Sequence, residues 1–184
     1  MLLCQTTREQ LLHLLPRGGE IAEIGVAEGD FSSAILAATA PRILHLIDPW
    51  EHQARDDYAS DVNNVSEERQ EARFTAVTVR FQSEISCGRV RMHRDYSEDA
   101  AIFFAAGQLD WIYVDGMHTE EAAYRDLTVY AGKLKPDGLI LGHDYTNHVQ
   151  ARAYLVEIRD FPRHGSFEHK TASVDGNLLV FPSF

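Results

Sequence analysis

Short apolar segments alternate with segments of helical periodicity along most of the chain, and this alternation restricts the possible folds more than any other feature. Four apolar runs have the length of buried strands, "EIAEI", "RILHLI", "LDWIYV" and "GLILG", and the segment "GRVRMH" alternates as a half-buried strand does. The stretches between them place apolar residues at helical spacing. Strands that alternate with helices pair in parallel and are joined by right-handed crossovers. The sequence therefore predicts an open α/β sheet with helices on both faces.

The end of the chain breaks this alternation. The segment "FEHKTASVDGNLLVFPSF" predicts a hairpin that turns at 175–177 and adds antiparallel strands to the sheet. Together the segments predict a doubly wound, Rossmann-like sheet of seven strands, mostly parallel, with an antiparallel C-terminal hairpin strand. The sequence contains no repeat or interdomain linker, so we expect a single domain over 1–184.

The first strand is followed by a glycine turn and a helix. Gly25 and Gly29 end the strand, and the expected helix cap is Asp30 or Ser32. Glycines at such a turn let the backbone approach a ligand and direct free helix N–H groups toward it. The turn lacks the G-x-G-x-x-G of dinucleotide sites, and the sequence has no P-loop. Glu28 would also repel a pyrophosphate.

Each of the five expected parallel strands ends in or beside an acidic residue. These residues are Glu23, Asp48, Asp95, Asp115 and Asp144. Because ligands of open α/β sheets bind outside the carboxyl ends of the strands, these side chains mark a candidate site. Asp48, at the end of the second strand, can accept hydrogen bonds from ribose hydroxyls. With the glycine turn, this pattern favours a ligand that has a ribose but no phosphates.

Composition and charge exclude several classes of partner. The 184 residues are 45% hydrophobic and 24% charged, as in ordinary globular domains. The net charge of −11 argues against nucleic acid or an anionic membrane as a partner. Cys4 and Cys87 are too few for a disulfide framework or a zinc cluster, and we find no signal peptide or membrane-spanning run. We therefore expect a cytoplasmic protein.

Several motifs resemble those of a known family. The motif "EIGVAEG", the acid after the second strand and the strand plan resemble the class I S-adenosylmethionine-dependent methyltransferases. The segment "LDWIYVDGMHTEEAAYRDL" followed by "KPDGLILGHDY" is similar to the family that contains the macrocin-type O-methyltransferases and relatives of cephalosporin hydroxylase. The likeness runs from about 20 to 144. It implies transfer of a methyl group from S-adenosylmethionine to a hydroxyl group of a small molecule.

The resemblance implies a role in binding S-adenosylmethionine at each matched position. The amino-acid end of the cofactor would lie against the first turn and a later strand end, at Glu23, Gly25, Val26, Gly29 and Asp115. The ribose hydroxyls would bind Asp48, and the adenine would pack beside Pro49 and Trp50. The adenine edge would be read after the third strand, by Asp95, Tyr96 and Ser97. Tyr96 and Ser97 also suit a helix N-cap.

The resemblance also implies a divalent metal, Mg²⁺ or Mn²⁺, held by Asp115 and Asp144. These residues end neighbouring expected strands, and a hard cation relieves the repulsion between paired carboxylates. Relatives carry Asp or Asn beside the second carboxylate, whereas this chain has His143. An imidazole favours Mn²⁺, Fe²⁺ or Zn²⁺ over Mg²⁺. The alternative is that no metal binds and that His143 is structural.

His118 is the candidate catalytic base, acting beside Asp115. In catechol-type relatives a lysine at the corresponding position takes the proton of the acceptor hydroxyl, and an imidazole titrates near neutral pH. The alternatives for His118 are a metal ligand and a residue that starts the following helix. The polar stretch 51–83 is expected to form a substrate lid.

The sequence leaves the assembly and two other functions open. A second subunit could supply the cap domain that larger relatives carry, in which case the protein would be a homodimer. A nicotinamide-dependent oxidoreductase is one alternative function, although the missing G-x-G-x-x-G counts against it. A non-enzymatic S-adenosylmethionine-binding module is the other.

Overall fold

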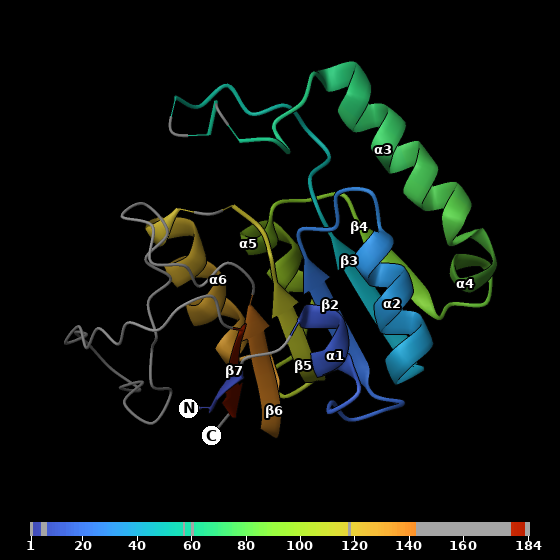
Figure 1. Ribbon diagram of the computed structural model, residues 1–184, viewed down its shortest axis with the longest axis vertical. Helices are drawn as coiled ribbons and strands as arrows, with labels where there is room; N and C mark the ends of the chain where they lie inside the picture. The colour runs from blue at the N-terminus through green and yellow to red at the C-terminus, as the bar shows by residue number, and fades with distance from the viewer. Residues whose placement is uncertain are drawn as a thin grey trace.

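A twisted seven-stranded sheet forms the centre of the molecule (Figure 1). The computed structural model describes residues 2–4, 7–56, 58–59, 61–117, 119–142 and 178–182. The strands are β1 (Leu2–Cys4), β2 (Glu20–Ile24), β3 (Ile43–Ile47), β4 (Val90–His93), β5 (Leu109–Val114), β6 (Leu134–Gly142) and β7 (Leu178–Pro182). Their order in the sheet is β1-β7-β6-β5-β2-β3-β4. The predicted α/β architecture is therefore confirmed.

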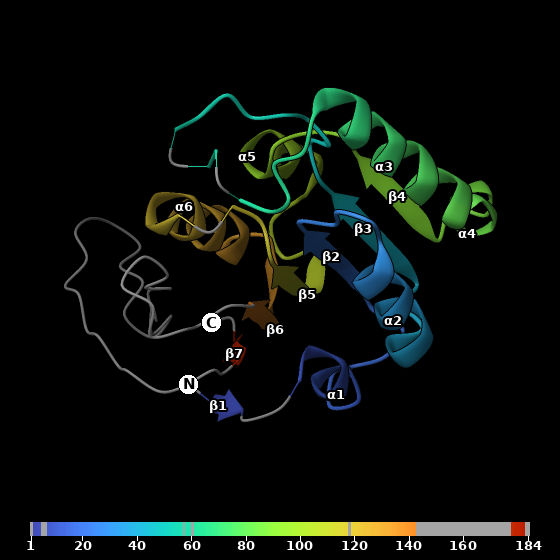
Figure 2. The ribbon, with the colours of Figure 1, turned by 45° about the horizontal axis from the view of Figure 1, so that its top comes forward.

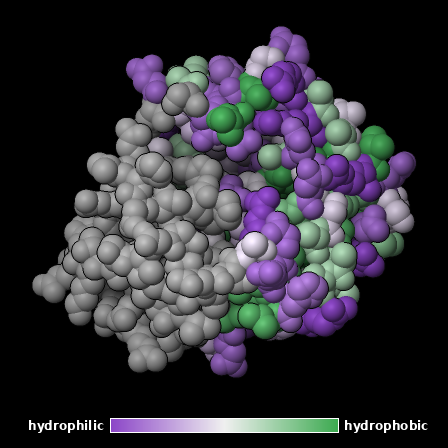
Figure 3. All heavy atoms as spheres, in the orientation of Figure 1, coloured by the Kyte–Doolittle hydropathy of each residue, from purple (hydrophilic) through white to green (hydrophobic). Residues whose placement is uncertain are grey.

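Helices cover both faces of the sheet (Figure 2). They are α1 (Arg8–Leu12), α2 (Asp30–Thr39), α3 (Glu67–Arg80), α4 (Gln82–Ser86), α5 (Ser97–Ala100), the 3₁₀ helix η1 (Ala101–Phe103) and α6 (Glu120–Ala131). Helices α1 and α2 lie on one side of the strands, and α5 and α6 lie on the other. On the face seen in Figure 3, hydrophilic side chains predominate over the described part of the surface.

The five strands predicted to be parallel are parallel in the structure. Strands β6, β5, β2, β3 and β4 pair in sequence, each parallel to its neighbour. Both faces of the central strands β2, β3 and β5 are largely buried, which explains why they are mostly apolar, whereas β4 at the edge of the sheet has one buried residue in four. In β5, Trp111 and Tyr113 pack toward α1 and α2, whereas Ile112 packs with Tyr130 of α6.

The antiparallel part of the sheet differs from the predicted hairpin. Strand β7 pairs antiparallel with β6, with Leu141 opposite Val180. Its other neighbour is β1 at the N-terminus, with Leu3 opposite Leu179. The turn predicted at 175–177 and the preceding arm of the hairpin lie outside the described residues. A short strand at 2–4 was not predicted, because three residues carry too little periodicity to be recognised.

Local signals at the helix starts are only partly confirmed. Thr7 caps α1 and forms a reciprocal capping box with Gln10. Helix α2 has neither Asp30 nor Ser32 as its cap. Its N-cap is Gly29, whose φ of +75° is left-handed and which has no side chain to donate or accept a hydrogen bond. The hydroxyl of Ser32 instead faces the sheet, where it reaches Glu23.

Candidate functional site

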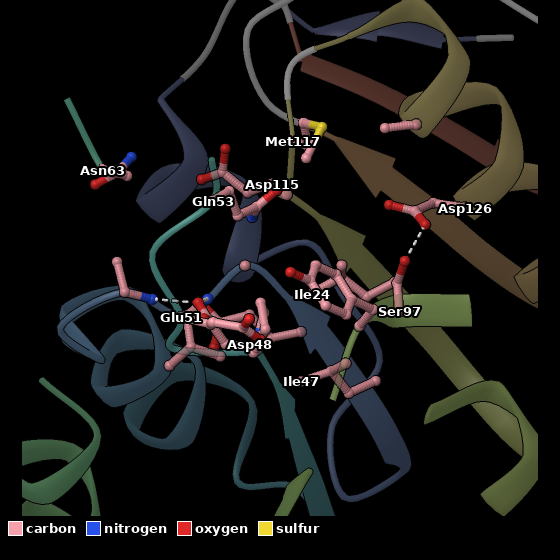
Figure 4. Close-up of a pocket in the computed structure, with 18 of the residues that line it drawn as sticks. Ile24, Ile47, Asp48, Glu51, Gln53, Asn63, Ser97, Asp115, Met117 and Asp126 are labelled. Atoms are coloured by element: carbon pink, nitrogen blue, oxygen red, sulfur yellow. Dashed lines mark hydrogen bonds between the residues drawn. The ribbon is translucent and has the colours of Figure 1, made fainter. Parts of the chain in front are cut away.

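A cavity of about 550 Å³ opens at the carboxyl ends of the parallel strands (Figure 4). Its walls come from the ends of β2, β3 and β5, from the residues after β4, and from the loop that precedes α3. Gly25, Val26, Asp48, Pro49 and Asp115 line it, as predicted. The parallel register brings these residues together, because Ile24 lies between Ile47 and Val114 in the sheet.

The glycine turn is shaped by its contact with the neighbouring strand. Gly25 has a φ of +82°, and an added Cβ would lie 2.0 Å from the carbonyl oxygen of Asp115. From its place in the sequence pattern, this glycine is predicted to allow close approach of a ligand. The structure shows that the backbone at the end of β5 already leaves no room for a side chain at this position. Gly29 does not line the cavity; a Cβ there would meet the ring of Phe81 at 3.0 Å.

Asp48 holds the glycine turn in place. Its Oδ2 accepts the N–H groups of Val26 at 2.9 Å and Ala27 at 3.0 Å, and its Oδ1 accepts that of Trp50 at 2.7 Å. Burial raises the pKa of Asp48, while these three N–H groups favour its charged form. A carboxylate has about four acceptor sites, so roughly one remains for the ribose predicted to bind here.

Trp50 lies in the core and not beside the cavity. Its side chain is fully buried, packs on Phe74 and donates from Nε1 to the carbonyl oxygen of Ala27 at 2.9 Å. Both Trp50 and Ala27 have left-handed backbones, with φ of +43° and +49°. Such conformations cost about 1–2 kcal/mol each in non-glycine residues. The hydrogen bonds to Asp48 and from the indole to Ala27 compensate for this strain. Because the indole is buried in the core, Trp50 does not line the cavity, and the predicted contact with the adenine is not found there.

A buried polar cluster lies at the ends of β2 and β5. Arg8 of α1 donates to Asp115 at 3.1 Å, and its guanidinium stacks over Phe31 at 4.6 Å. Glu23 is 1% exposed and accepts a hydrogen bond from Ser32 at 2.5 Å. Burial raises the pKa of Glu23 to about 8, the Ser32 bond opposes that rise and the negative charge of Asp115 adds to it. The cluster thus offers a cation, a carboxylate and a neutral carboxyl to one end of the cavity.

The protonated state of Glu23 gives a testable pH dependence. Below about pH 8 the folded protein keeps this carboxyl protonated, whereas the unfolded chain ionises it above pH 4.5. The free energy of unfolding should therefore fall as the pH rises from about 4.5 to 8. Glu23→Gln removes the ionisation, so we expect it to stabilise the ligand-free protein by about 3 kcal/mol at pH 7.

Urea unfolding of parent and Glu23→Gln between pH 5 and pH 8 measures this effect, and the gap should widen with pH. Glu20→Gln on the same strand is the control. Burial alone would raise the pKa of Glu20, but hydrogen bonds from Gln108, His45 and Arg42 lower it. The Glu20 contribution is present above the unfolded pKa, so this substitution should destabilise at neutral pH. A pH-independent gap for Glu23→Gln would contradict the assignment.

The opposite end of the cavity is an apolar slot with a polar edge. Ile24, Ile47 and Ala122 line it, and Asp95, Tyr96 and Ser97 follow β4 along its side, as predicted. Tyr96 occupies the N-cap position of α5 but makes no side-chain cap. Ser97 donates to the Oδ1 atom of Asp126, a buried carboxylate of α6. Figure 4 shows this bond beside Ile24 and Ile47.

Two functional candidates were missed by sequence reasoning. Arg8 gives no local signal, because its partner Asp115 is 107 residues away. Asp126 could have been found: it lies four positions after Ala122 and four before Tyr130, on the apolar face of α6. An acidic residue on the apolar face of a helix is expected to be buried, and a buried carboxylate in turn indicates a specific hydrogen-bonding or binding role.

The predicted lid contributes to the cavity wall. Within 51–83, the residues that line the cavity are Glu51, Gln53, Arg55, Tyr58, Asn63, Gln70 and Arg73. Arg73 pairs with Glu28 of the glycine turn at 3.4 Å and donates to the carbonyl oxygen of Asn63 at 3.0 Å. The lid segment is therefore tied to the first βα turn.

Three of the four residues predicted for catalysis and metal binding lie outside the described residues: His118, His143 and Asp144. Within the part of the chain that the structure describes, no group of three or more His, Cys, Asp or Glu side chains is arranged to hold a metal ion. Asp115 is the described member of the predicted pair, and a guanidinium occupies one of its oxygens. No helix among the described residues is long and apolar enough to cross a membrane.

Solved structures share this fold at low sequence identity. A structural-genomics target from Corynebacterium glutamicum is 17% identical with a TM-score of 0.52, over 76% of this chain and 59% of that one. The geranyl diphosphate C-methyltransferase of Streptomyces coelicolor, solved with Mg²⁺, geranyl diphosphate and S-adenosyl-L-homocysteine, is 13% identical with a TM-score of 0.52, over 73% and 44%. The cyclopropane synthase MmaA2 of Mycobacterium tuberculosis is 15% identical with a TM-score of 0.51, over 74% and 41%.

These likenesses establish the fold, and this chain spans between 41% and 59% of the three structures' lengths. No curated protein matches the sequence. The model of a family described as a methyltransferase domain matches residues 22–145, which is more than half of the chain. That range includes the glycine turn, Asp48, the residues after β4 and the end of β5. The chain therefore belongs to the methyltransferase-domain family.

Proposed function

We propose that this protein is an S-adenosylmethionine-dependent methyltransferase that acts on a hydroxyl group of a small molecule. The observation that carries the proposal is the division of one cavity into three chemically distinct parts. The polar cluster of Arg8, Glu23 and Asp115 suits the ammonium and carboxylate of an amino acid. Asp48 suits a ribose, and the apolar slot suits a purine. S-adenosylmethionine joins these three groups in that order without a phosphate.

The proposed reaction is a direct displacement. The acceptor oxygen attacks the methyl carbon in line with the sulfonium sulphur, the C–S bond breaks, and sulphur keeps the electron pair. The products are a methyl ether and S-adenosylhomocysteine, and the hydroxyl proton passes to a base. His118 remains our prediction for that base, and the segment 51–83 remains our prediction for the substrate lid. The proposal of a homodimer likewise rests on the sequence alone.

Metal assistance is a separate part of the proposal. The described residues do not by themselves fit a divalent cation, because Asp115 is already paired with Arg8 at 3.1 Å. A metal would have to compete with that guanidinium and recruit His143 and Asp144. We derive no catalytic step through it. Turnover that survives dialysis against EDTA would remove the metal from the proposal, and loss restored by Mn²⁺ or Mg²⁺ would support it.

Calorimetry with the purified protein tests the proposed function. S-adenosylmethionine and S-adenosylhomocysteine should bind, whereas NAD⁺ and NADP⁺ should not, because Glu28 and the glycine turn disfavour a pyrophosphate. Formation of S-adenosylhomocysteine should then be followed across a panel of sugars, catechols and other hydroxylated molecules. Binding of the nicotinamide cofactors alone would favour the oxidoreductase. Cofactor binding without turnover on any acceptor would favour the binding module.

A further inference from the structure

Asp126 is a buried carboxylate that the fold does not fully use. The residue is 5% exposed and lies on α6, at the end of the cavity away from Arg8. Its Oδ1 accepts the Ser97 hydroxyl, whose residue is fixed in turn by a 2.7 Å bond from the Tyr130 hydroxyl to its carbonyl oxygen. Among the described residues, Oδ2 has no hydrogen-bond donor. This oxygen borders the cavity, where a bound ligand could donate a hydrogen bond to it.

The free oxygen faces the apolar slot. Asp126 lines the cavity, and Oδ2 lies 3.6 Å from where a Cβ on Gly116 would be, so it points toward the end of β5. In Figure 4 the second oxygen of Asp126 is directed away from Ser97, toward the space beside Ile24 and Met117. Burial raises the pKa of Asp126 to about 6, and the Ser97 bond opposes that rise. The carboxyl is therefore mainly charged at neutral pH and acts as an acceptor only.

A planar base with a hydrogen-bond donor on its edge satisfies this arrangement. The faces of the slot are aliphatic, formed by Ile24, Ile47 and Ala122. The exocyclic amino group of adenine carries donors only, whereas a 6-oxo purine would place a carbonyl oxygen against the carboxylate. In Figure 4, Ile24 and Ser97 lie between Asp48 and Asp126, which matches a base held beyond a ribose.

We propose that Asp126 reads the adenine of the cofactor, with Oδ2 accepting a hydrogen bond from the 6-amino group while Ser97 holds Oδ1. This inference rests on the proposed function, since it names the base of the same ligand. Asp126 is then a binding residue that selects adenine. The residues after β4, which the sequence assigns to the adenine edge, act partly through it, because Ser97 orients its carboxylate.

A thermodynamic cycle of ligand and protein tests the proposal. The ligands are S-adenosylhomocysteine and its 6-deamino analogue, which lacks only the amino group. A hydrogen bond to a charged acceptor predicts that the parent binds the analogue about 10- to 100-fold more weakly. Asp126→Asn keeps a side-chain oxygen for the Ser97 hydroxyl but loses the charge. We expect its preference for S-adenosylhomocysteine over the analogue to fall by about 10-fold or more.

Glu121→Gln, an exposed carboxylate on the same helix, is the matched control and should keep the parent's preference. The parent alone already decides the question if a variant fails to fold: equal affinity for the two ligands overturns the inference. An unchanged preference in Asp126→Asn, even with a lowered melting temperature, also overturns it and leaves the carboxylate a purely structural link between α5 and α6. A parent that binds neither ligand overturns the proposed function itself.

Discussion

Gly25→Ala is expected to destabilise the protein by about 2–5 kcal/mol and to abolish cofactor binding in the fraction that remains folded. An alanine in a left-handed backbone at φ +82° lowers the free energy of unfolding by about 1–2 kcal/mol, and overpacking lowers it by about 1–3 kcal/mol more. Its Cβ would lie 2.0 Å from the carbonyl oxygen and 2.5 Å from the carbonyl carbon of Asp115. Neither atom can move freely, because Asp115 donates its N–H to the carbonyl oxygen of Ile24 at 2.8 Å. Denaturant unfolding and calorimetry with S-adenosylhomocysteine measure the two effects.

Gly18→Ala separates the backbone conformation from the close contact. Gly18 has a similar φ of +78°, but an added Cβ would have nothing within 4 Å. We expect this control to lose only the conformational part, about 1–2 kcal/mol, and to keep its cofactor affinity. Equal losses at the two positions would show that the approach of β5 does not select glycine at Gly25.

Asp48→Ala is expected to weaken the binding of S-adenosylhomocysteine at least 100-fold. The substitution leaves the N–H groups of Val26, Ala27 and Trp50 without their acceptor, and an unsatisfied buried donor costs about 1–3 kcal/mol. It also releases the left-handed backbones of Ala27 and Trp50, so the wall of the cavity should rearrange. In addition to the loss of affinity, we expect the free energy of unfolding to fall by a few kcal/mol, as measured by urea denaturation.

Asp48→Asn and a modified ligand distinguish the two roles of this side chain. The amide oxygen can still accept from one side of the turn, so Asn should lose less stability than Ala. If Asp48 also reaches the ribose, 2′-deoxy-S-adenosylhomocysteine should bind the parent more weakly than S-adenosylhomocysteine does, and this difference should shrink in Asp48→Asn. Parental affinity in Asp48→Ala would remove the residue from the cofactor site.

Local periodicity was enough to predict the parallel strands and the end of the sheet where the site lies. Buried parallel strands are apolar on both faces, so β3 and β5 stand out as continuous apolar runs in a polar sequence. The acids at the strand ends could be placed together in space from the same pattern, because the carboxyl ends of parallel strands lie at one edge of the sheet. Gly25, Asp48 and Asp95 were found in this way and all line the cavity.

Positions whose role depends on a neighbour in space were predicted less well. Trp50 follows the ribose-binding acid along the chain, but its positive φ turns the indole away from the cavity into the core. Gly29 was assigned to the ligand, whereas its left-handed φ of +75° and the nearby ring of Phe81 disfavour a side chain there. Both errors come from reading proximity along the chain as proximity to the ligand.

The sequence by itself determined the succession of strands and helices along the chain, the family resemblance and the acidic edge of the sheet. Each of these depends on residues that are close together along the chain. Only the tertiary structure decided which groups meet at that edge. Arg8 pairs with Asp115 and Ser97 with Asp126 across 107 and 29 residues. Such contacts are set by strand order and by the packing of α1 and α6 on opposite faces of the sheet. Hydrophobic periodicity does not predict these contacts, because it indicates which face of a helix or strand is buried and not which residues that face contacts.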